Sequence, residues 1–469
     1  MKIPFILILA VSLAVSILSC KDKDDNEAPT IPTDVENPLK AGEVSVPVKA
    51  DPSFSWAPVS GSVNLGDLKG NSSTEPLMIS MGDAVEAGYR DGGLYRQGQL
   101  TSYPNLVARQ MGIINFKQAL FEKENGNGTG YLVKSNSETV PVFNEVINNL
   151  AYTEKGSALM KPYSGTIPDN LSAPFGGRNI FAVNPSEELS YVVNFYKNNP
   201  QPAYLSNTNY FWVNGYVNAS LFSRYVGREY NSAWDYAKTI KPDVALVSTV
   251  FDIYILNYLR GGQRGLFGGS EFNWELQVLN YLKEKGTKSV LATVPDVLDF
   301  PYFKWYTFDK MTKKMGNAIG IQSDDASTLP GANAETIFLP TVNVVSVYNG
   351  NSKRSYFQDL DVIRKDEISR PEFYNEILLK WSKEYNQPLV DFYSVYKKVL
   401  AGNYVSDDGF KIDPSYPNGN FFSSDGLYPS AIGQAVLANE VIKVLNATYH
   451  AQIPLINISN YAAEMSKVK

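Results

Sequence analysis

One turn of the sequence has the form of a catalytic turn but lacks a reactive atom. An apolar, strand-like run that starts at Met78 ends in Gly82-Asp83 and leads into a helix-like segment. Turns of this kind present a nucleophilic serine at the start of the helix. The residue at that position is Ala84, whose methyl group has no oxygen to attack a carbonyl. The turn therefore leaves two interpretations, an enzyme that works differently or an enzyme fold that has lost its reaction.

The remaining reactive side chains are few. The chain has one histidine, His450, and one cysteine, Cys20, which is too small a set for a typical zinc site. His450 follows the last predicted helix, and we expect it at the surface. Asp83, Glu86 and Asp425 form one alternative acid-base group. If they lie near one another at the mouth of the sheet, they could act on a glycosidic bond, because paired carboxylates hydrolyse such bonds when their spacing is right. In the simpler interpretation Asp83 and Asp425 belong to the scaffold and Glu86 is solvated. No cofactor is expected.

The N-terminus predicts export and a lipid anchor. Residues 1–19 have the form of a signal peptide, with Lys2 before an apolar run that is shorter than a spanning helix. Cys20 follows a small residue, as at bacterial lipoprotein processing sites, so we expect it to become the acylated N-terminus. Residues 20–60, rich in Asp, Pro and Asn near their start, are predicted to be a flexible tether.

Charge and composition restrict the partners. The net charge of -6 argues against a nucleic-acid partner, because binding to phosphates depends on positive charge. Acidic residues directly after Cys20 resemble the signal that sends some lipoproteins of Gram-negative bacteria to the outer face of the outer membrane. We therefore expect a protein of the outer membrane that is lipid-anchored and faces the cell exterior. The acidic residues are Asp22, Asp24 and Asp25.

The folded region, residues 61–469, alternates between strand and helix patterns. Short apolar runs predict strands that are buried on both faces, and helical periodicity predicts the segments between and after them. This alternation is typical of an α/β fold with a parallel sheet. Two long stretches, at about 115–241 and 308–367, do not fit and are interpreted as insertions. The strands are expected at 77–81, 244–250, 289–294 and 388–392, and the helices at 273–285, 372–385 and 431–447. The helix at 372–385 is expected to turn Phe373, Ile377, Leu378 and Trp381 inward.

Three blocks of the chain resemble the SGNH/GDSL-type hydrolases, in particular a lipoprotein branch of that family. They are "MGDAVEAGYRDGGLYRQGQLTSYPNL", "VPDVLDFPYF" and "SSDGLYPSAIGQAVLANEVIKVLNATY", in the order and spacing of the family. The resemblance implies a three-layer α/β/α fold over most of residues 75–457. It also implies a reaction that uses a serine nucleophile, a histidine base with its aspartate, and glycine and asparagine donors to the oxyanion.

Most of the residues that this reaction needs are replaced. Ala84 stands in the serine position, and Tyr428, a poor proton acceptor at neutral pH, stands in the histidine position. Phe251 stands where the oxyanion asparagine belongs. Asp425 remains in the carboxylate position, where we favour a turn-capping role, and Gly176 is matched to the glycine block.

These losses predict a pseudoenzyme. The leading hypothesis is a binding or accessory subunit of an outer-membrane complex, with a transporter or an assembly barrel as its partner. A second hypothesis is a glycan held in the remnant pocket. The alternative is an active esterase or lipase, acting on carbohydrate or lipid esters with relocated catalytic residues. The residues proposed for the glycan pocket are Tyr89, Tyr95, Tyr103 and Tyr428.

Overall fold

The computed structural model divides the chain into two units, 1–40 and 41–469, and all described elements belong to the second. The first unit lies outside the described residues, and with it the predicted signal peptide, Cys20 and the first half of the tether. Several internal segments also lie outside the described part. The structure describes residues 42–69, 75–153, 160–174, 224, 230, 232–248, 250–259, 272–316, 318–323, 328–364 and 371–468.

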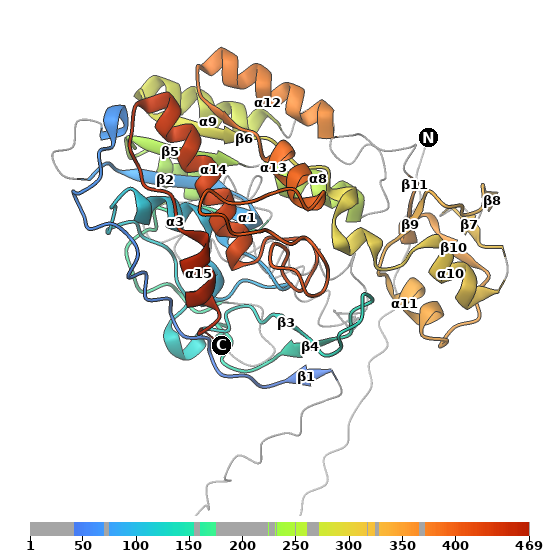
Figure 1. The fold of residues 1–469 in the computed structure, drawn as a ribbon. Helices are drawn as coiled ribbons and strands as arrows, with labels where there is room; N and C mark the ends of the chain where they lie inside the picture. Colours follow the sequence, from blue (N-terminus) through green and yellow to red (C-terminus); the bar gives the residue numbers. More distant parts are fainter. Residues whose placement is uncertain are drawn as a thin grey trace, which may run out of the picture. The chain divides into compact units, whose positions relative to one another are not determined.

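A four-stranded parallel sheet forms the centre of the second unit (Figure 1). Its strands, in the order in which they lie, are β12 (Leu389–Val390), β6 (Lys288–Ala292), β5 (Val244–Ser248) and β2 (Met78–Gly82). Every residue of β2 is buried, as the continuous apolar run predicts for a strand covered on both faces. The predicted strands and the α/β class are confirmed.

A fifth chain segment extends the sheet beyond β2. Ser80 forms an isolated parallel bridge with Asn170, and its amide donates to the carbonyl of Asp169 at 3.0 Å. In chain order, the five segments therefore lie in the sequence 2-1-3-4-5. This order reverses direction between the first and third segments, and such switch points are where open α/β sheets place their ligands. Here the switch point lies between the C-terminal ends of β2 and β5.

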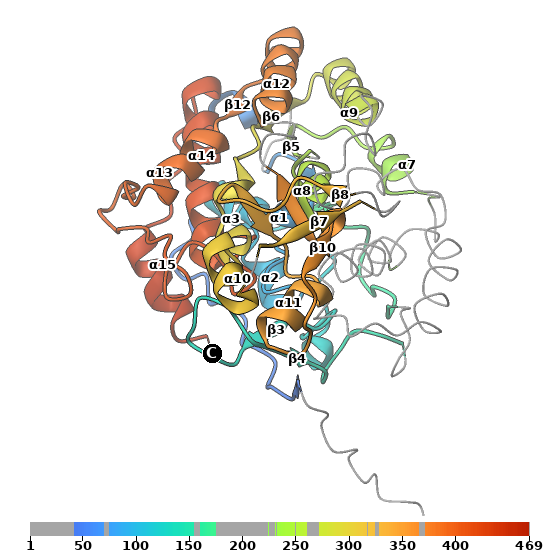
Figure 2. The same cartoon turned by 90° about the vertical axis from the view of Figure 1, so that its right-hand side faces the viewer.

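Helices cover both faces of the sheet (Figures 1 and 2). On one face α3 (Tyr103–Gln110) packs against α14 (Ala431–Tyr449). On the other α9 (Phe272–Lys285) packs against α12 (Pro371–Tyr385). These bounds confirm the three predicted helices.

One predicted helix face needs a correction. Phe373 was expected to face the core, but 56% of it is exposed. The inward residues of α12 are Tyr374, Leu378 and Trp381, which follow each other at spacings of four and three. Phe373 lies one position off this stripe, about 100° around the helix, so its ring points outward.

The described part of the insertion predicted at 308–367, residues 308–316, 318–323 and 328–364, forms a small subdomain (right-hand side of Figure 1). It contains a three-stranded and a two-stranded sheet. Asp361 organises part of it, because its carboxylate accepts hydrogen bonds from the side chains of Thr341 and Asn343 and from the amide of Gln358. Its elements are α10 (Phe308–Met315), β7 (Gly320–Gln322), β8 (Thr328–Leu329), β9 (Thr336–Phe338), α11 (Val342–Tyr348), β10 (Tyr356–Gln358), η5 (Asp359–Asp361) and β11 (Val362–Arg364).

The predicted tether boundary at residue 60 is wrong. Strand β1 (Glu43–Val44) pairs in parallel with β4 (Phe143–Val146), which pairs on its other edge with β3 (Leu132–Lys134). Further along, Phe54 is buried in the main core. Valines at alternate positions let this short stretch bury one side against the domain, so the fold begins near residue 42.

The remaining elements are short. Among the described residues, no helix is both long enough and apolar enough to cross a membrane. The elements not yet named are η1 (Gly66–Lys69), α1 (Ala84–Ala87), α2 (Arg96–Leu100), η2 (Lys123–Asn125), α7 (Ala233–Ala237), α8 (Phe251–Leu259), η3 (Val297–Asp299), η4 (Pro301–Lys304), α13 (Phe392–Leu400) and α15 (Ile458–Met465).

Candidate functional site

The turn after β2 is closed within the domain. Asp83 precedes the short helix α1, and its amide donates to Glu86 Oε2 at 2.9 Å. Ala84 begins the helix and has no exposed surface. Its amide donates to Asp252 Oδ2 at 3.0 Å. The position at which a nucleophile would be presented is therefore covered, and its N–H already has an anionic acceptor from this chain.

Asp252 links the two strand ends at the switch point. It is the second residue of α8, which follows β5, and it is fully buried. Its carboxylate accepts from the amide of Ala84, and its own amide donates to Asp83 Oδ2 at 3.0 Å. The turn after β2 and the turn after β5 thus hold each other through two reciprocal carboxylate bonds.

Tyr428 completes this network from the C-terminal part of the chain. Its hydroxyl lies 3.2 Å from Asp252 Oδ1 and donates to it. Its ring meets that of Tyr89 edge to face, with centroids 5.1 Å apart. Burial, together with the charge of Asp252, raises the pKa of Tyr428 well above its ordinary value. The phenol is therefore a hydrogen-bond donor here, whereas the position in the resembled family needs a proton acceptor.

Asp425 caps a turn. Its Oδ1 accepts from the amides of Leu427 and Tyr428, at 2.8 and 2.9 Å, and its Oδ2 accepts from the amide of Gly92 at 3.0 Å. These contacts match the turn-capping role that we favoured. Burial, with the nearby charge of Asp91, raises the pKa of Asp425 to about 6.

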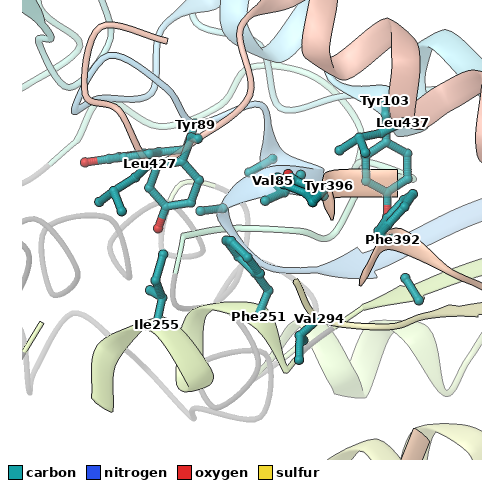
Figure 3. Packing of buried hydrophobic residues seen from close by; sticks show 14 of the residues in the cluster. Val85, Tyr89, Tyr103, Phe251, Ile255, Val294, Phe392, Tyr396, Leu427 and Leu437 are labelled. Atoms are coloured by element: carbon teal, nitrogen blue, oxygen red, sulfur yellow. The ribbon is translucent and has the colours of Figure 1, made fainter. Parts of the chain in front are cut away.

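Phe251 fills the space beside Tyr428. It is 5% exposed, and the two ring centroids lie 6.1 Å apart. Figure 3 shows Tyr89 and Leu427 on one side of this packed region, with Phe251 and Ile255 of α8 facing them. The structure thus places four of the five positions that were matched to the resembled family around the switch point: Ala84, Phe251, Asp425 and Tyr428. The fifth, Gly176, lies outside the described residues.

The prediction of a glycan pocket lined by four tyrosines is wrong. All four tyrosines are buried, with at most 2% of any of them exposed, so they present no open ring face to a sugar. Their rings pack in the core, and the hydroxyl groups of Tyr95, Tyr103 and Tyr428 each donate to a carboxylate. The four residues are Tyr89, Tyr95, Tyr103 and Tyr428.

The carboxylates proposed for acid-base work are also buried. Glu86 was expected to be solvated, but it is 1% exposed and accepts from the hydroxyl of Tyr103 at 2.7 Å. Burial raises its pKa, while the Tyr103 bond acts in the opposite direction. Asp83 and Asp425 accept from backbone amides, as described above. All three are therefore engaged in contacts that hold turns in place.

A small cavity lies at the sheet edge beyond β2, next to the segment that contains Asn170. Its volume is about 20 Å³, enough for a water molecule. One of its walls is the buried Arg224, whose guanidinium donates to the carbonyl groups of Lys161, Ala119 and Leu120. The other lining residues are Ala87, Leu94, Gln99, Gln118, Ala119, Asn170, Ser172 and Ala173.

His450 lies apart from this network. It ends α14 with a positive φ of 54°, and its imidazole is at the surface, as predicted. Its Nδ1 lies 2.9 Å from Asp67 Oδ2. Within the described part of the chain, no group of three or more His, Cys, Asp or Glu residues is arranged to hold a metal ion.

The sequence patterns did not single out Asp252 as a candidate site residue. Its position in the chain was the available signal, because a carboxylate four residues after the end of β5, opposite the turn after β2, lies at the switch point of the sheet.

Comparison with protein-family models, with curated proteins and with solved structures finds no match for this chain.

Proposed function

We propose that this protein is a surface-exposed outer-membrane lipoprotein whose SGNH-like domain does not hydrolyse esters and serves as a binding or accessory subunit of an outer-membrane complex. The carrying observation is the closed network of Ala84, Asp252 and Tyr428. In an esterase of the resembled family the positions of Ala84, Phe251 and Tyr428 hold a nucleophile, an oxyanion donor and a base. Here they hold a methyl group, a phenyl ring and a phenol, and the Ala84 amide and the Tyr428 hydroxyl both donate to the Asp252 carboxylate.

The esterase alternative has little support in this geometry. The one histidine of the chain, His450, lies at the surface at the end of α14, where its imidazole contacts Asp67. An oxyanion that formed near the Ala84 amide would meet the Asp252 carboxylate, and two negative charges in a buried site repel each other strongly.

Turnover assays test the enzymatic half of the proposal. The mature chain and a fragment from residue 42 are incubated with p-nitrophenyl acetate, p-nitrophenyl butyrate and acetylated oligosaccharides. We expect hydrolysis at the rate of buffer alone. Turnover that disappears in a folded Asp425→Ala variant would overturn the proposal, because it would give that carboxylate a catalytic role.

The anchor and the partner need separate tests. Metabolic labelling with palmitate should label the natural chain and not the Cys20→Ser variant, and only the natural chain should be found in the membrane fraction.

Cross-linking in cells, followed by purification from detergent-solubilised membranes, should recover an outer-membrane barrel or transporter with the protein. Recovery of the lipoprotein alone would contradict the accessory role, whatever the result of the labelling.

A further inference from the structure

The first described segment, residues 43–51, is a strap laid on the domain with one side inward. Val44, Val46 and Val48 are partly buried, whereas Ser45 and Pro47 between them are exposed. Asn148 fixes its centre twice, because its Oδ1 accepts from the Val46 amide at 2.9 Å and its Nδ2 donates to the Val46 carbonyl at 2.8 Å. We call this segment the strap.

The strap docks on a small apolar cluster separate from the main core. The cluster consists of Tyr95, Tyr131 and Val146, with Val44 and Val46 of the strap packed against it. At the C-terminal end of the strap, Asp51 forms a two-pronged ion pair with Arg96, at 2.7 and 2.8 Å. Since few apolar groups of the strap reach the main core, the strap can release while the rest of the domain stays folded.

Lys49 joins the strap to the candidate site. Its ammonium lies 5.1 Å from the ring centroids of both Tyr95 and Tyr131, a cation-π arrangement with two rings. The hydroxyl of Tyr95 donates to Asp91 Oδ2 at 2.7 Å. Burial lowers the pKa of Lys49, and the charge of Asp91 acts against this. Burial acts to raise the pKa of Asp91, but the charges of Lys49 and Arg90 and the hydrogen bonds from Tyr95 and Ser424 together outweigh it and keep the pKa low.

Asp91 in turn holds the loop that contains Tyr428. Its Oδ1 accepts from the amide of Ser424 at 2.8 Å, and its own amide donates to Ser423 Oγ at 3.1 Å. Asp425 returns the contact by accepting from the amide of Gly92. The loops at 90–93 and 423–428 are thus fastened by two carboxylates, Asp91 and Asp425. Asp91 also accepts from the hydroxyl of Tyr95, whose ring lies under the ammonium of Lys49.

We propose that the docked strap controls the order of the loops at 90–93 and 423–428, with Lys49 as the positioning residue. When the strap releases, Lys49 leaves, and Asp91 remains beside Asp425 with less positive charge to balance the pair. Repulsion between the two carboxylates then weakens the fastening of both loops. The state of the N-terminal segment is in this way transmitted to the switch point. This inference does not depend on the proposed function, since it concerns only the coupling of two parts of the domain.

Hydrogen exchange of the mature chain, measured by mass spectrometry, tests this coupling. Lys49→Met removes the ammonium and keeps a side chain of similar length. We expect exchange of the 90–93 and 423–428 amides to rise about tenfold, with α14 and the central sheet unchanged. Lys49→Arg should keep the natural protection, and the exposed Lys398→Met on α13 is the matched control.

Two results would overturn the proposal. One is a rise confined to the strap itself, which would mean that docking is not transmitted. The other is an equal rise over the whole domain, which would mean that Lys49 contributes only to global stability. Val46→Asp provides an independent route, because it should detach the strap without changing Lys49 and should reproduce the loop pattern of Lys49→Met.

Discussion

Asp91 and Asp425 each accept a hydrogen bond from the backbone amide next to the other. The Ser424 amide lies 2.8 Å from Asp91 Oδ1, and the Gly92 amide lies 3.0 Å from Asp425 Oδ2. Residues more than 330 positions apart in sequence are therefore joined by exchanged contacts. This pair ties the N-terminal and C-terminal blocks of the domain together.

Asp425→Ala should destabilise the domain by about 2–4 kcal/mol, because three buried amides lose their acceptor. Equilibrium unfolding in urea measures the change. Asp413→Ala is the matched control, since Asp413 caps an exposed turn by accepting from the amide of Ser415 at 2.8 Å. Its loss should cost under about 1 kcal/mol, because water replaces the lost contact. Equal losses in the two variants would contradict a buried role for Asp425.

The Asp425 carboxyl should make stability fall as pH rises towards neutrality. Its pKa is raised to about 6 in the folded state, against about 4 in an unfolded chain. The native state therefore binds the proton more tightly. The resulting contribution is complete below about pH 4 and is lost as pH rises through about 6, for a total of roughly 3 kcal/mol. Urea unfolding at several pH values should show this fall in the natural chain and a smaller fall in Asp425→Asn. Parallel curves for the two proteins would refute the assignment.

Tyr428→Phe should cost about 1–3 kcal/mol, because the buried Asp252 loses a hydrogen-bond donor. The chain offers a close control. Tyr393 donates to Glu372 at 3.2 Å, the same distance as between Tyr428 and Asp252, but at an exposed position. Tyr393→Phe should therefore have little effect on the free energy of unfolding. If both substitutions cost the same, burial of the Asp252 contact is not what stabilises the switch point.

Ala84→Ser should not produce an esterase. The new hydroxyl would lack a base, and the adjacent amide would still be bonded to Asp252. Since Ala84 has no exposed surface, the hydroxyl should also lower the free energy of unfolding by about 1 kcal/mol. The ester assay and urea unfolding measure the two effects. Ala447→Ser, at an exposed position of α14, is the control for the stability term.

Glu464→Ala should loosen the chain after the strap. The Glu464 carboxylate accepts from the Ser53 hydroxyl at 2.7 Å, from the Phe54 amide at 3.1 Å and from Trp56 Nε1 at 2.6 Å. Limited proteolysis should cut near residues 50–60 several times faster in the variant than in the natural chain. Glu376→Ala, at an exposed position of α12, is the control. Unchanged cleavage would show that these residues are held by other contacts.

Local patterns predicted the central sheet and its helices well. β5, β6 and α14 begin within one residue of the expected positions, because each combines an unbroken apolar run or stripe with clear turn residues. Phe373 shows the limit of this reasoning. A stripe that is one residue wider than the true contact face looks the same in sequence, and only the neighbouring packing decides which aromatic residue is inside.

Non-local contacts were beyond local patterns. The network of Ala84, Asp252 and Tyr428 joins residues that are 168 and 176 positions apart. The docking of the strap also depends on β4 and Asn148, about 100 positions away. A polar, Pro-containing stretch with a few valines is typical of a linker. It becomes part of the fold only because β4 and Asn148 provide a surface on which it docks.

The contact between Ser53 and Glu464 closes the chain on itself, since 411 positions separate the two residues. The two ends of the domain are therefore held together by noncovalent contacts. A circularly permuted chain, in which a linker joins the segment after Glu464 to the segment before Ser53 and new ends lie in an exposed loop, should keep the fold. The linker would also keep the two segments close in the unfolded chain, and so reduce the conformational entropy that the chain gains on unfolding.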